Sequence, residues 1–89
     1  MATPESVSLD VELLLTLFPG DALLVTRLLV QDDAFRNVCE DLLLAKRTLT
    51  RLEGFQQEQQ PAKIREYRQL VIELNSEVAK VLEHARRPA

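Results

Sequence analysis

Apolar residues recur at alternating spacings of three and four in two stretches of this chain. The first row runs from Phe35 to Leu52, and the second runs from Ile64 to Val81. This spacing keeps apolar side chains on one face of a helix, and it is the heptad pattern of helices that pack side by side. We therefore predict a seam between two helices that contains Phe35, Val38, Leu42, Leu49, Leu52, Ile64, Tyr67, Val71, Leu74, Val78 and Val81.

A short polar link joins the two rows. It contains Gly54, which suits the end of a helix, and Pro61, which suits the first turn of the next helix. A link of this length reverses the chain and lays the second helix against the first. The pattern predicts an all-α fold built on a long antiparallel helical hairpin, with the returning helix over residues 61–86.

Two further apolar segments precede the hairpin. We predict a short helix over residues 4–18 that ends before Pro19-Gly20, with a later start near Asp10 as the alternative. A second helix is predicted over residues 21–53 in one nearly continuous piece. Because aspartates favour helix starts, a break near residues 31–33 is the alternative. In either case the chain forms one helical domain.

Three consecutive leucines at residues 42–44 point in directions about 100° apart, which is more than one facing helix covers. A chain of 89 residues also buries only a modest share of its surface. We expect a non-enzymatic association module, in which a helical bundle is completed by a second copy, as a homodimer or tetramer, or by another helical protein. The residues expected to make these contacts are Val11, Leu14, Leu15, Phe18, Leu43 and Leu44.

Formal charge is divided unevenly along the chain. Residues 1–45 carry −6 and residues 46–89 carry +3, which leaves a net charge of −3. An acidic part that faces the basic part of a second copy, and the reverse, is self-complementary under two-fold symmetry. The charge pattern therefore favours a homodimer.

Six basic residues surround the predicted tip of the hairpin. A regulator or adaptor that contacts nucleic acid through this tip is the alternative function. A net acidic chain makes nucleic-acid binding the weaker interpretation, because that affinity depends largely on neutralising phosphates. The basic residues are Lys46, Arg47, Arg51, Lys63, Arg65 and Arg68.

Residues that support catalysis are sparse. His84 is the single histidine and lies near the C-terminal end of the predicted last helix, where a positive charge is favourable. Cys39 is the single cysteine, so it has no partner for a disulfide within the chain. The sequence shows no phosphate-binding loop and no Glu-x-x-His metal pattern. We expect no enzymatic activity, no metal and no cofactor.

Membrane insertion is not expected, because the apolar runs are far shorter than the roughly 20 residues that span a bilayer. The first residues lack the basic start and the apolar core of a secretory signal. We therefore expect a cytoplasmic protein.

From Leu17 onward the order of features resembles the YdcH-like family of very short bacterial proteins. The matching elements are Phe18-Pro19, Asp33-Ala34-Phe35, Arg51-Leu52-Glu53 and the leucine-spaced return helix from Glu66 to Leu82. The resemblance covers about the last three quarters of the chain, and the leading helix lies outside it. It implies a helical hairpin that associates through coiled-coil packing, and it implies no catalytic residues.

Overall fold

The computed structural model describes residues 10–54 and 60–87. The helices are α1 (Val11–Leu17), a 3-10 turn η2 (Pro19–Asp21), α2 (Ala22–Gln31), α3 (Asp33–Gly54) and α4 (Pro61–Arg86). The described residues contain no strand, so the all-α prediction is confirmed for them.

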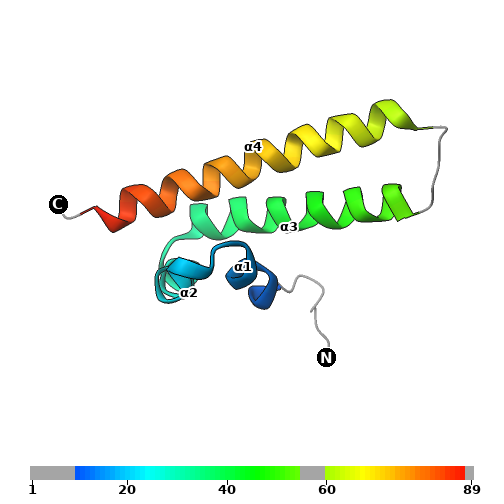
Figure 1. Ribbon diagram of the computed structural model, residues 1–89. Helices are drawn as coiled ribbons and strands as arrows, with labels where there is room; N and C mark the ends of the chain where they lie inside the picture. The colour runs from blue at the N-terminus through cyan, green and yellow to red at the C-terminus, as the bar shows by residue number, and fades with distance from the viewer. Residues whose placement is uncertain (1–9, 55–59, 88–89) are drawn as a thin grey trace.

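The two long helices, α3 and α4, lie side by side and run in opposite directions (Figure 1). Helices α1 and α2 lie on another side of α3, against its N-terminal half (Figure 1). The chain bends by 111° between Val11–Leu17 and Pro19–Gln31. Because of this bend, α1 does not continue in line with α2.

The core lies where the four helices meet. Its members are all apolar and come from each of the helices, so α3 is packed both by α4 and by the α1–α2 segment. Eight buried residues form it: Leu14, Val25, Phe35, Cys39, Leu42, Leu43, Val78 and Leu82. Full burial of one such leucine or phenylalanine stabilises the fold by about 2 kcal/mol.

A break at Asp32 separates α2 from α3. Asp32 has an extended backbone, with φ −126° and ψ 105°, and its Oδ1 accepts a hydrogen bond from the backbone N–H of Phe35 at 3.0 Å. This is the geometry of a helix N-cap. The nearly continuous helix predicted over residues 21–53 is therefore wrong, and the alternative with a break near residues 31–33 describes the chain.

Polar contacts hold α2 in its folded-back position. The Arg36 Nε donates a hydrogen bond to the carbonyl oxygen of Leu29 at 3.1 Å, across the break. At the other end of α2, Arg86 Nη1 of α4 lies 3.5 Å from Asp21 Oδ1. Asp21 makes no side-chain capping bond to α2 and pairs with α4 instead.

The start of α1 also has a capping aspartate. Asp10 Oδ1 accepts a hydrogen bond from the backbone N–H of Leu13 at 3.1 Å, and the helix begins at Val11. Residues 4–9 of the predicted first helix lie outside the described residues. Helix α4 begins at Pro61 and ends at Arg86, the same bounds as in the sequence pattern.

No single helix within the described ranges is long and apolar enough to cross a membrane.

Substitution of the cap between α2 and α3 tests this arrangement. We expect Asp32→Ala to lower the free energy of unfolding by about 1 kcal/mol, because the Phe35 N–H loses its acceptor. Urea denaturation followed by circular dichroism measures the change. Asp33→Ala is the matched control: it removes an exposed ion pair to Arg36 and an acidic side chain from the first turn of α3, but no capping hydrogen bond, so its loss should be smaller. Equal losses for the two variants would contradict the assigned cap.

A second prediction concerns the core thiol. Burial raises the pKa of Cys39 to about 12, and the nearby Glu40 charge adds to the rise. Since the thiolate is the reactive form, we expect disulfide reagents to modify the native protein only as fast as it unfolds. Adding urea should make the reaction fast. Rapid modification of the folded protein would show that Cys39 is accessible.

Candidate functional site

The predicted seam residues all lie in buried or partly buried positions. Phe35, Leu42 and Val78 are fully buried, and the other eight retain some exposure. The seam is therefore occupied within the chain, and the surfaces open to a partner lie elsewhere.

The structure divides the six residues that were predicted to contact a partner. Leu14 and Leu43 belong to the core of the chain itself, and Leu43 is only 5% exposed. Their assignment to an intermolecular contact is corrected: α1 and α2 cover the side of α3 that carries Leu43. Leu15 and Phe18 are partly buried against the same core. Val11 and Leu44 are exposed, on different helices.

Leu44 lies near the middle of α3 and is 59% exposed. Glu40 and Asp41 lie about one turn before it, and Arg47 and Arg51 lie one and two turns after it. All four charged residues are exposed, and none forms an ion pair with another described residue. We refer to these five residues as the Leu44 surface. It has an apolar centre, an acidic end and a basic end.

A shallow groove of about 340 Å³ borders the Leu44 surface, between α3 and α4. Leu44 and Leu70 form its exposed apolar rims, and Leu70 comes from α4. The other lining residues are Asp41, Ala45, Thr48, Tyr67 and Leu74. The groove continues the apolar surface of Leu44 onto the second long helix.

The six basic residues predicted at the tip do not form one surface. Arg68 Nη2 lies 2.7 Å from Glu53 Oε2, so its charge is paired across the α3–α4 junction. Lys63 and Arg65 are two positions apart on α4, which places them about 200° apart around the helix. The remaining three, Lys46, Arg47 and Arg51, all lie on α3 and line a separate site.

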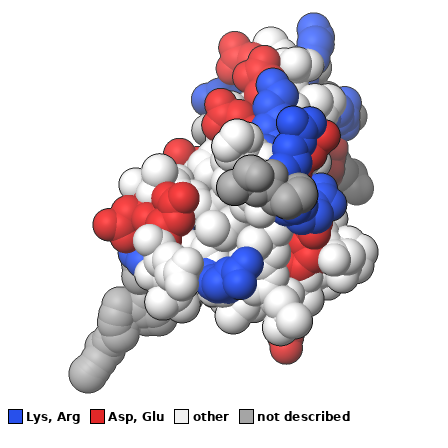
Figure 2. Space-filling model, turned by 90° about the vertical axis from the view of Figure 1, so that its left-hand side faces the viewer, with Lys and Arg blue, Asp and Glu red and all other residues white. Residues whose placement is uncertain are grey.

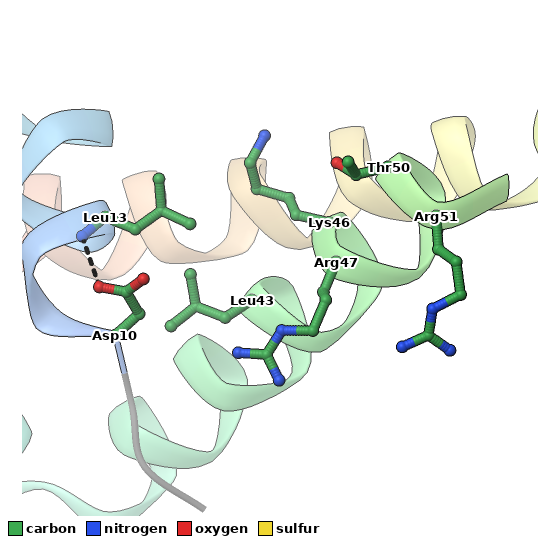
Figure 3. Close-up of a pocket in the computed structure, with 7 residues that line it drawn as sticks. All are labelled: Asp10, Leu13, Leu43, Lys46, Arg47, Thr50 and Arg51. Atoms are coloured by element: carbon green, nitrogen blue, oxygen red, sulfur yellow. Dashed lines mark hydrogen bonds between the residues drawn. The ribbon is translucent and has the colours of Figure 1, made fainter. Parts of the chain in front are cut away.

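That site is a hollow of about 470 Å³ between α1 and α3. Figure 3 shows Arg47 and Arg51 extending from the same side of α3, with Leu13 of α1 and Leu43 beside them. We refer to it as the basic hollow. Its lining residues are Asp10, Leu13, Leu43, Lys46, Arg47, Thr50 and Arg51.

The outer face of α2 is an apolar surface that the sequence reasoning missed. Leu23 is 88% exposed and Val30 is 76% exposed. Figure 2 views the end of the molecule where α2 lies and shows a broad uncharged area there. The sequence of α2 does indicate such a surface, because its apolar residues lie on more sides of the helix than the one side that packs on the core.

The described residues offer little for catalysis. They contain no group of three or more His, Cys, Asp or Glu side chains that could hold a metal ion. His84 is exposed on the last turns of α4, and Cys39 is buried with a raised pKa. The exposed chemistry of this chain consists of apolar and charged surfaces.

Comparison with known proteins returns no matching family model, curated protein or solved structure.

The different roles of two adjacent leucines give a direct test. We expect Leu43→Ala to lower the free energy of unfolding by about 3 kcal/mol, because it leaves a cavity in the core. Leu44→Ala should change it by no more than about 0.5 kcal/mol at low protein concentration, because the residue is exposed. Urea denaturation measures both. Similar losses would mean that Leu44 is packed within the single chain.

Proposed function

We propose that this protein is a self-association module that forms a two-fold homodimer through the Leu44 surface. The observation that carries the proposal is the position of Leu44: a largely exposed leucine in the middle of α3, between an acidic end and a basic end. Isolated exposed leucines are common. A leucine flanked by opposite charges on the two sides is suited to a copy of itself.

Antiparallel packing of two α3 helices brings these charges together. With the two-fold axis near Leu44, each leucine meets its counterpart. Asp41, three positions before Leu44, then faces Arg47 of the second copy, three positions after it. Glu40 faces Thr48 and lies within about one turn of both Arg47 and Arg51 of the second copy. Symmetry repeats this pairing on the other side of the axis. Opposite charges that face each other fix the relative orientation of the two copies and raise the rate at which they associate.

The size of the available face depends on how much of α4 it includes. Helix α3 has 22 residues and is about 33 Å long. One helix is about 10 Å wide, so α3 alone offers about 330 Å², and α3 with the whole of α4 beside it offers on the order of 700 Å². A standard interface buries about 800 Å² on each partner. The groove rimmed by Leu70 contributes the α4 part, and the two long helices of each copy together make a four-helix arrangement.

Helix α4 alone does not offer the same complementarity. Glu66 and Glu73 lie on either side of Leu70. A two-fold axis at Leu70 would bring these like charges close together, which is unfavourable, although Lys63 and Glu77, seven positions before and after Leu70, would pair. Leu70 is also less exposed than Leu44, at 39% against 59%. The proposed axis is therefore assigned to α3, with α4 at the edge of the contact.

The nucleic-acid alternative has less support from the same geometry. Its six basic residues lie on separate sides of α3 and α4, and Arg68 is already paired with Glu53. Affinity for a phosphate backbone needs many cations on one surface. The resemblance to YdcH-like hairpins stays a prediction, and it agrees with self-association.

Charge reversal on the Leu44 surface tests the dimer. By light scattering after size exclusion, we expect twice the 10.1 kDa mass of one chain at about 100 µM, which implies a Kd near 1 µM or below. Glu40→Lys with Asp41→Lys should weaken association at least tenfold, since basic ends then face each other. Arg47→Glu with Arg51→Glu should do the same.

The fourfold variant that carries all these reversals is the decisive control. It keeps the net charge of the chain and restores opposite charges across the axis, so it should regain the dimer mass. Leu23→Ser, on the exposed face of α2, should leave the mass unchanged. A monomeric wild type, or a fourfold variant that stays dissociated, would refute the proposed interface.

A further inference from the structure

We propose that the basic hollow is a binding site for a small amphipathic anion, namely a carboxylate or phosphate group attached to a short alkyl chain. Three observations carry this inference. The hollow has more cations than acidic residues, its one acidic lining residue, Asp10, already caps α1, and leucines lie beside the cations. The hollow shares Arg47 and Arg51 with the proposed dimer surface, whereas Lys46 belongs to the hollow alone.

Among the described residues, the lining of the hollow carries more cations than carboxylates. Lys46, Arg47 and Arg51 form no ion pair with any residue in the described ranges. The one acidic lining residue, Asp10, uses its Oδ1 to accept the hydrogen bond from the Leu13 N–H. The lining therefore offers three cations, of which Arg47 and Arg51 extend from one side of α3 and Lys46 from another, against one carboxylate that caps α1 (Figure 3).

The two arginines favour an oxyanion. Arg47 and Arg51 are separated by four positions, and Figure 3 shows them extending from one side of α3. Like charges at this spacing repel each other. A carboxylate or phosphate between them removes the repulsion and accepts the paired N–H bonds that guanidinium groups donate.

The leucines favour an alkyl chain on that anion. Leu13 and Leu43 lie beside the cations, and the aliphatic stem of the half-buried Lys46 lies in the same lining. Leu43 is only 5% exposed and forms the floor of the hollow, so the apolar surface open to water comes from the half-buried Leu13 and the Lys46 stem. An alkyl chain covers that surface, whereas a bare inorganic anion leaves it in contact with water. The volume of about 470 Å³ falls within the usual range for small-molecule sites.

Lys46 separates this site from the proposed dimer surface. It is two positions from Leu44, which places it about 200° away around α3. A substitution at Lys46 therefore changes the basic hollow and leaves the Leu44 surface intact. Arg65 on α4 is a matched control, because it is an exposed cation remote from the hollow.

Octyl phosphate, kept below its micelle concentration, is the probe for the full-length chain. We expect saturable binding by calorimetry, with amide shifts in nuclear magnetic resonance spectra centred on Leu13, Leu43, Lys46 and Thr50. Lys46→Gln and Arg47→Gln should each weaken binding at least threefold, and Arg65→Gln should leave it unchanged. Octanoate should bind at the same residues, since the head group is an oxyanion in both.

Three results would overturn the inference. The first is the absence of saturable shifts at these residues. The second is equally tight binding of inorganic phosphate, which would mean that the leucines contribute nothing. The third is equally tight binding of octylammonium, which would mean that the cations contribute nothing. Light scattering on the Lys46→Gln variant keeps the two proposals apart, because its oligomeric mass should match that of the wild type.

Discussion

The packing of α3 on two of its sides is the constraint on which the rest of the structure depends. Leu42 lies in the seam with α4, and Leu43 lies in the core with the α1–α2 segment. Because successive residues of a helix point about 100° apart, neighbouring leucines enter different contacts. The hairpin accounts for one side of α3 and the folded-back α1 and α2 for another. Leu44 then lies on the side that no other part of the described chain covers.

Much of this architecture could be predicted from the sequence because it follows from local periodicity. The all-α fold and the bounds of α4 come from apolar spacing and from Pro61. The break at Asp32 was harder to predict, because the apolar spacing continues through a residue whose side chain favours a cap. The role of Leu43 could not be read from spacing, since the pattern does not show which side of α3 receives α1 and α2.

The positions of the charged side chains on the helices matter more for binding by this chain than its net charge does. The sequence pattern groups six basic residues near the hairpin tip, yet helix geometry separates them. Arg68 is paired with Glu53, Lys63 and Arg65 lie on opposite sides of α4, and the other three line the basic hollow. Arg47 and Arg51 lie between the hollow and the Leu44 surface. The two proposed sites therefore draw on the same guanidinium groups, so a bound anion and a bound second copy compete for them.

The three leucines at residues 42–44 have the same chemistry and differ only in angular phase. A deletion of one residue early in α3 turns everything after it by about 100°. The amino-acid composition of the helix hardly changes, while a different leucine is presented to the outside. In such a protein, the length of one helical segment is by itself a means for evolution to exchange an interior contact for an exterior one.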